Sequence, residues 1–104
     1  MIARIWKAQA DKEKTTDYAK FFENTVLPEL RQIMGFRGAY VMEKPNGDGM
    51  EIEVMTLWET MDAVREFAGD NFDQAVVEPG VQAIVRSFDK TVSHHEILVS
   101  HLGS

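Results

Sequence analysis

Two adjacent histidines near the end of the chain, His94 and His95, are of a type that can exchange a proton with a substrate at neutral pH. Their spacing argues against a shared metal ion, because consecutive residues of a strand point to opposite faces of a sheet. His94 would share its face with Glu96, and we take His94 as the candidate base. His95 is expected to pack against helices or to reach solvent. For both residues the common alternative is a structural role without chemistry.

Aromatic and polar side chains elsewhere in the chain could complete a site for a small ligand. Trp6 shares a strand face with Arg4 and could line a cavity, or it could pack in a subunit interface. Trp58 stands at the end of a strand, where stacking on a ligand is conceivable and packing in the core is the more common role. Tyr40 and Asn24 are further candidates for contact with a substrate.

The composition excludes several kinds of chemistry. The chain has no cysteine, so it has no thiolate nucleophile, thiolate-bound zinc or iron-sulfur cluster, and this is consistent with a reducing cytoplasm. The motifs GxSxG, GxxxxGK[ST] and GxGxxG do not occur, which removes the usual sequence support for a hydrolase, a kinase or a dehydrogenase. We expect no bound metal.

Charge and hydropathy argue against two kinds of partner. Lys and Arg number 11 against 17 Asp and Glu, a formal net charge of −6, and the basic residues are scattered. Binding to nucleic acid depends on clustered basic residues, so no such partner is expected. No apolar run approaches the roughly 18 to 20 residues that cross a bilayer, so we expect no membrane partner and a cytoplasmic location.

The length of 104 residues suits one domain, which we place at residues 1–100, with residues 101–104 as a tail. Such a chain buries about two thirds of its unfolded surface, which is enough for one modest core and one small site. A larger pocket would need a second subunit.

Hydrophobic periodicity predicts a strand over residues 1–9 and then an amphipathic helix from Asp11 to Met34. Pro28 lies inside the helical pattern and predicts a kink or a break near Leu27. Two further strands flank Pro45-Asn46-Gly47-Asp48-Gly49, whose turn chemistry predicts a hairpin.

The second half is expected to begin with a helix capped by Thr60 and ended by Gly69. A short helical piece over residues 72–76, a helical stripe over residues 81–88 and a last strand over residues 91–99 follow. This order predicts an α+β fold of the ferredoxin-like split βαβ type, with a four-stranded antiparallel sheet and helices on one face.

Alternation along the strands predicts two unlike sheet faces. The more apolar series, Ile52, Val54, Thr56 and Trp58, is expected to meet the helices. The other face is expected to carry members of a mixed set: Arg4, Trp6, Tyr40, Met42, Glu53, Met55, His94, Glu96 and Leu98. Glutamates in this set would supply paired carboxylates or neutralise a buried cation. A mixed face of this kind suits a partner, and we predict a homodimer with sheets packed face to face.

Three passages, MIARIWKA, LWETMDAVREFAG and VSHHEIL, set on this order of elements, resemble the antibiotic biosynthesis monooxygenase superfamily over nearly the whole chain. The resemblance implies a ferredoxin-like protomer in a dimeric α+β barrel. The superfamily includes cofactor-independent oxygenases of polyketide aromatics and quinols, haem-degrading enzymes, and members without assigned activity.

The resemblance also argues against haem degradation. Haem-degrading members have an Asn on the first strand, a Trp on the second main helix and a His ten residues later. Here Phe67 stands at the Trp position, Val77 follows ten residues on, and the first strand has no Asn. Trp58 belongs to the strand-end motif LWET and does not replace the missing tryptophan.

The resemblance implies, as one hypothesis, a cofactor-independent monooxygenase acting on a small aromatic or quinol-like substrate. His94 would deprotonate the substrate, the resulting anion would reduce O₂, and Trp6, Tyr40 and Trp58 would shape a dry cavity. The alternative is a non-catalytic dimer of the same fold that binds a small hydrophobic ligand.

Overall fold

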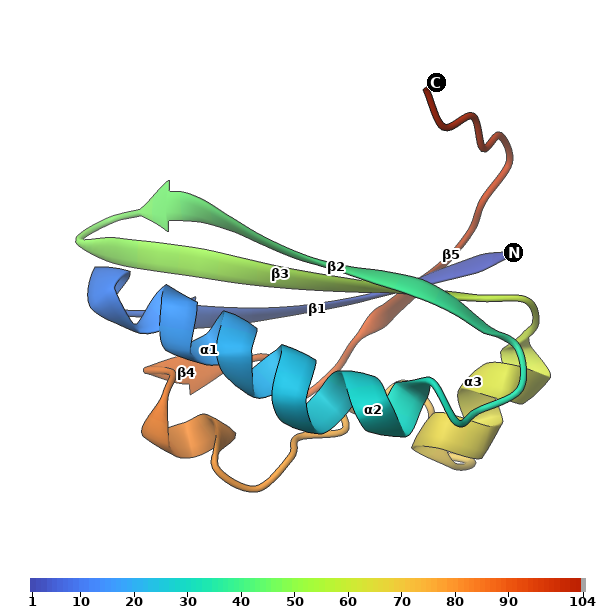
Figure 1. The fold of residues 1–104 in the computed structure, drawn as a ribbon, viewed down its shortest axis with the longest axis horizontal. Coiled ribbons are helices and arrows are strands. Elements are labelled where there is room, and N and C mark those ends of the chain that lie inside the picture. Colours follow the sequence, from blue (N-terminus) through green and yellow to red (C-terminus); the bar gives the residue numbers. More distant parts are fainter. Residues whose placement is uncertain (104) are drawn as a thin grey trace.

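The computed structural model describes residues 1–103. Its elements in chain order are β1 (Ile2–Ala10), η1 (Lys12–Lys14), α1 (Thr15–Phe21), η2 (Phe22–Val26), α2 (Leu27–Leu30), β2 (Phe36–Asn46), β3 (Gly49–Trp58), α3 (Met61–Ala68), η3 (Val81–Ala83), β4 (Ser87–Phe88) and β5 (Ser93–Glu96). The sheet is antiparallel with the order β2-β3-β1-β4, and β5 also pairs with β1. Figure 1 shows the helices together on one side of this sheet. The predicted α+β fold with helices on one face is confirmed.

The first helical run, from Lys12 to Leu30, changes its winding in the middle. Phe22–Val26 is a π-helical turn between α1 and α2, and Pro28 stands in the first turn of α2. Proline has no N–H to donate and crowds the preceding turn, so the wider turn before it accommodates the residue. The irregularity predicted near Leu27 is present as a change of helix type, and the chain remains helical through it.

The hairpin and the capped helix follow their local sequence signals, as predicted. Asn46 pairs with Gly49 across a two-residue turn in which Gly47 has a φ of 61°. The hydroxyl of Thr60 accepts a hydrogen bond from the Ala63 N–H at 3.2 Å, and this bond caps the start of α3. Gly69, with a φ of 81°, follows the last residue of α3.

The fourth position of the sheet is divided between two short strands, contrary to the single strand predicted for residues 91–99. β4 pairs with one half of β1 and β5 with the other half, on the same edge. The backbone leaves the ladder between them, and there the indole N–H of Trp6 donates to the carbonyl of Asp89 at 2.8 Å. The described sheet therefore has five strands in four positions.

Two helical predictions in the second half are wrong. Residues 72–76 form turns and an isolated bridge, and the stripe over residues 81–88 is reduced to η3 and β4. The carbonyls of Phe72 and Gln74 accept hydrogen bonds from the buried side chain of Arg4. A side chain from a distant strand thus satisfies groups that helical N–H donors would otherwise bond, and periodicity alone could not reveal it.

The strand register places Arg4, Trp6 and His94 on the sheet face that the helices cover. Arg4 lies opposite Thr56 on one side and His94 on the other, and Trp6 lies opposite Val54. Thr56 and Val54 are buried, so their series meets the helices as predicted. The prediction that set Arg4, Trp6 and His94 on the partner-facing side is wrong. A charged residue suggested an open face, whereas hydrogen bonds inside the fold satisfy this arginine.

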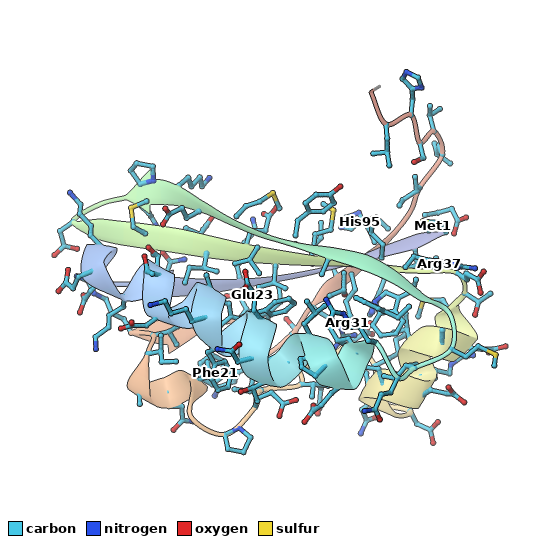
Figure 2. The ribbon with its side chains drawn as sticks, in the orientation of Figure 1. Met1, Phe21, Glu23, Arg31, Arg37 and His95 are labelled. Carbon is cyan, nitrogen blue, oxygen red and sulfur yellow. The ribbon has the colours of Figure 1, made fainter. Side chains whose placement is uncertain are left out.

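The opposite face, which we call the outer face, keeps Tyr40, Met42, Glu53 and Met55 of the mixed series. Glu96 shares its side of β5 with His94, and Leu98 lies beyond the strand, so the prediction that set them on this face is also wrong. Tyr40 lies opposite Met55 and Met42 opposite Glu53, and the exposed fractions of Tyr40 and Met42 are 51% and 39%. His95 also lies on this side, away from the helices (Figure 2), and bonds the hydroxyl of Ser93. Within residues 1–103 no helix has the length and hydropathy needed to cross a bilayer.

Candidate functional site

A cavity of about 60 Å³ lies between the sheet and the helical layer. Its walls are mainly aliphatic and aromatic. The charged and aromatic side chains in its lining are Arg4, Trp6, Tyr18, Phe22, Phe67 and Glu78. A cavity of about 150 Å³ has been found to hold benzene, so an aromatic ligand would require this one to widen. The irregular segment 76–78 forms part of the wall and is held by few regular backbone bonds.

Arg4 is the charged centre of this cavity. Its side chain is almost fully buried, with 5% exposed, and its guanidinium donates to the carbonyls of Phe72 and Gln74 at 2.6 and 3.0 Å. The guanidinium also lies 5.6 Å from the centre of the Phe67 ring, within the range of a cation–π contact. Burial lowers the pKa of Arg4 to about 10, so the residue still carries its charge at neutral pH.

Two donors of Arg4 remain available to a ligand. The Nε–H and the second N–H of Nη2 have no acceptor among the hydrogen bonds of the described residues. No side-chain nitrogen or oxygen of these residues is fully enclosed without a partner, so the Nε–H has access to open space. Because Arg4 lines the cavity, an anionic oxygen placed there could accept this bond.

His94 supports Arg4 from the neighbouring strand β5. Its Nε2 atom lies 2.9 Å from a terminal nitrogen of Arg4, and since a guanidinium can only donate, Nε2 is the acceptor. The ring proton is therefore on Nδ1, which lies 3.6 Å from the carboxylate of Asp73. Burial and the charge of Arg4 lower the pKa of His94, while Asp73 opposes them. His94 is thus held neutral, with its basic nitrogen engaged.

The carboxylate beside His94 differs from the one expected. Glu96, which we expected to accompany His94, lies 3.5 Å from the N-terminal amino group and is largely exposed. Asp73 takes the place beside the ring. His94 itself is not among the residues that line the cavity, so the structure gives it the position of a support for Arg4.

Trp6 and Tyr18 form the aromatic wall next to Arg4. Their ring centres are 6.1 Å apart, and Phe88 lies 6.2 Å from Trp6 on another side. Burial raises the pKa of Tyr18, so its phenol stays protonated at neutral pH. Trp6 and Arg4, two of the predicted binding residues, are therefore brought together in one cavity.

Three other predicted binding residues lie elsewhere. Trp58 is fully buried in the core, stacks on Phe67 and donates its indole N–H to Thr56 at 2.9 Å. It touches a residue of the cavity without lining the cavity itself. Tyr40 projects from the outer face, and Asn24 is exposed on η2.

Glu78 lines the cavity, and sequence reasoning did not select it. Burial and the neighbouring carboxylate of Glu29 raise the pKa of Glu78. The residue lies in an irregular segment just before Pro79, where no periodicity or motif marks it. Only the packing of that segment against the first helical run brings its side chain to the cavity.

The fold defines the class to which this chain can be compared: ferredoxin-like α+β proteins with a cavity between the sheet and the helices. Two solved structures share this fold over nearly the whole of both chains. An Arg-to-Ser mutant of MhuD, described with two manganese protoporphyrin IX molecules bound per active site, is 15% identical, with a TM-score of 0.69, and the match covers 99% of this chain and 100% of that chain. A candidate antibiotic biosynthesis monooxygenase from Bacillus cereus is 15% identical, with a TM-score of 0.70, and the match covers 100% and 97%.

These likenesses confirm the fold that the sequence resemblance implied. No protein-family model matches the sequence, and no curated protein is significantly similar to it. Phe67 and Val77, the two positions that the resemblance aligned with the haem-degrading Trp and His, both line the cavity. The described residues contain no group of three or more His, Cys, Asp or Glu that could hold a metal ion.

Proposed function

We propose that this protein binds a small aromatic hydroxyl compound, a phenol or quinol, in the cavity beside Arg4 and promotes its oxidation by O₂ without a cofactor. The observation that carries the proposal is a buried, charged arginine with an unbonded N–H in a mainly apolar cavity with aromatic walls. A fixed cation in a dry site stabilises an anion more strongly than water-exposed charges do. The fold shared with a candidate monooxygenase supports the same activity.

The reaction balances without an external reductant. A quinol and O₂ give a hydroxyquinone and water: one oxygen atom enters a ring C–H bond and the other leaves as water. The ring loses four electrons, and O₂ accepts them. Deprotonation of the quinol raises its electron density, and the charge of Arg4 stabilises the anion that forms.

The residues present do not fit a metalloporphyrin. The cavity is far smaller than such a macrocycle, and its lining contains no His, Cys or Met side chain. Tyr18, the one other side chain there of a type that binds haem iron, is held protonated because burial raises its pKa. No step through haem is therefore assigned.

A non-catalytic role in binding a hydrophobic ligand is the second candidate. The observation that favours it is the aliphatic character of most of the cavity wall, which includes Val26, Leu30, Val54 and Val77. Such a wall recognises shape and apolar surface without any chemistry.

We further propose that the working unit is a homodimer formed through the outer face. Tyr40 and Met42 are exposed there on the antiparallel sheet, together with paired charges such as Lys7 and Glu53 at 3.7 Å. Large exposed apolar side chains among such charges are typical of an interaction surface. The lack of cysteine favours a reducing compartment, and we propose the cytoplasm.

Oxygen consumption with a panel of hydroquinones tests the proposed activity. Wild type should consume O₂ in the presence of a chelator, and Arg4→Met should lose about 10²- to 10³-fold in kcat/KM, the usual cost of removing one oxyanion donor. Arg31→Met, at an exposed arginine after α2 (Figure 2), is the matched control and should leave the rate unchanged. Binding of these compounds without turnover would favour the second candidate, and neither binding nor turnover would refute both.

A further inference from the structure

Glu78 is the group in the cavity lining that can accept a proton at neutral pH. The other titratable side chains there are Arg4, which is charged, and Tyr18, whose phenol stays protonated because burial raises its pKa. The backbone of Glu78 is held at a turn, where the Val81 N–H donates to its carbonyl at 3.3 Å. This bond fixes one end of the segment from which Glu78 lines the cavity.

Burial is the first cause that raises the pKa of Glu78, because it disfavours the charged carboxylate. The neighbouring carboxylate of Glu29, from α2, raises the pKa of Glu78 further, because two like charges close together disfavour ionisation. Both causes move Glu78 toward the range where a carboxylate is an efficient general base.

His94 is poorly placed for this task. Its basic nitrogen accepts a hydrogen bond from Arg4, and its other nitrogen carries the proton that faces Asp73. To accept a substrate proton it would have to leave Arg4, and it would then place a second positive charge beside the guanidinium.

We propose that Glu78, assisted by Glu29, is the base that takes the hydroxyl proton of a phenol or quinol bound in the cavity. The inference rests on the proposed function, since it assigns a residue to the first step of that reaction. In this step the substrate O–H bond breaks and an O–H bond to the Glu78 carboxylate forms. No electron is transferred: the phenol becomes a phenolate beside Arg4, and Glu78 becomes a neutral carboxylic acid.

A test that does not depend on turnover uses 4-nitrophenol, whose phenolate form is coloured and whose neutral form is nearly colourless. Below the pKa of the free compound, wild type should bind it as the phenolate, and the carbon-13 signal of the Glu78 carboxyl should move to its protonated position. Glu78→Gln should bind the neutral phenol. An unchanged Glu78 signal on binding, or equal phenolate formation in Glu78→Gln, would overturn the inference.

Enzyme kinetics provide a second test of the role of Glu78. Glu78→Gln should lose about 10²- to 10⁴-fold in kcat/KM for a hydroquinone, the usual contribution of a general base. Glu29→Gln removes the carboxylate that raises the pKa of Glu78, so the rising limb of the pH profile should move to lower pH. Glu23→Gln, at an exposed residue of η2 (Figure 2), is the control and should behave as wild type.

The outcomes separate the two proposals. Oxidation by Glu78→Gln at the wild-type rate would refute the role of Glu78 and leave the proposed function standing. Proton transfer from the phenol to Glu78 without oxidation of any quinol would refute the oxidase activity and leave the role of Glu78 standing. If wild type binds no phenol, both fail.

Discussion

A single buried arginine connects three parts of the molecule at the scale of individual residues. Arg4 on β1 holds two carbonyls of the irregular segment after α3 and one nitrogen of His94 on β5. Hydrogen bonds to a charged donor contribute about 1.5 to 3 kcal/mol each, so the two bonds to Phe72 and Gln74 help to hold that segment. The wall of the cavity is therefore positioned by a side chain of the site itself.

The neutral state of His94 should make stability depend on pH. Because the folded-state pKa of His94 is lowered, its contribution is present above the unfolded value of about 6.5 and is lost as the pH falls below it. Wild type should therefore lose more unfolding free energy between about pH 7 and pH 5 than His94→Gln, in which an amide oxygen can still accept from Arg4.

Urea unfolding at a series of pH values measures this difference. His95→Gln, at the exposed neighbour on the other face, is the control and should follow wild type. Parallel pH dependence in wild type and His94→Gln would contradict the assigned tautomer and contact.

At the scale of elements, the junction between β2 and α3 depends on a close approach at Gly35. The residue has a φ of 95°, and a Cβ atom there would lie 2.7 Å from the Cβ of Ala63. Its carbonyl also accepts a bond from the Glu59 N–H at 2.8 Å, which ties the start of β2 to the end of β3.

Gly35→Ala should destabilise the fold more than Gly69→Ala. Both positions have positive φ, which costs an L-residue about 1 to 2 kcal/mol, but nothing lies within 4 Å of a Cβ at Gly69. The clash with Ala63 should add about 1 to 3 kcal/mol at Gly35. In a double-mutant cycle measured by urea unfolding, Ala63→Gly should recover that extra cost; additive effects would show that the contact does not matter.

The success or failure of each predicted element depended on how far away its partners lie in the chain. The helix cap at Thr60 and the hairpin at residues 45–49 depend on contacts between near neighbours in the sequence, so the local sequence was enough to predict them. Residues 72–76 carry apolar side chains at helical spacing, yet Arg4 provides their carbonyls with a partner from outside the segment. Local periodicity cannot predict a hydrogen-bond donor that is distant in the sequence, and Arg4 lies 68 positions before Phe72.

At the scale of the whole molecule, the outer face should determine the assembly. Met42→Glu would place a carboxylate opposite Glu53 and so introduce repulsion and desolvation into the proposed interface. Wild type should sediment at twice the chain mass of 11.8 kDa, and Met42→Glu should sediment as the single chain.

Met34→Glu is the matched control for this prediction. Met34 is 86% exposed in the loop before β2 and lies outside the sheet, so this variant should remain dimeric. Wild type at the mass of one chain would contradict the dimer, and a dimeric Met42→Glu would move the interface away from the outer face.

The sequence by itself determined the order of strands and helices as far as α3, the hairpin, the capped helix and the apolar series on β3, because each depends on periodicity or on turn chemistry within a few residues. It also marked Arg4, Trp6 and His94 as residues of interest. The tertiary structure alone decided that these three lie beneath the helices, that the last strand is divided, and that Glu78 reaches the cavity. Each of these depends on contacts such as that between Arg4 and His94, which are 90 residues apart and are formed only when the chain closes on itself.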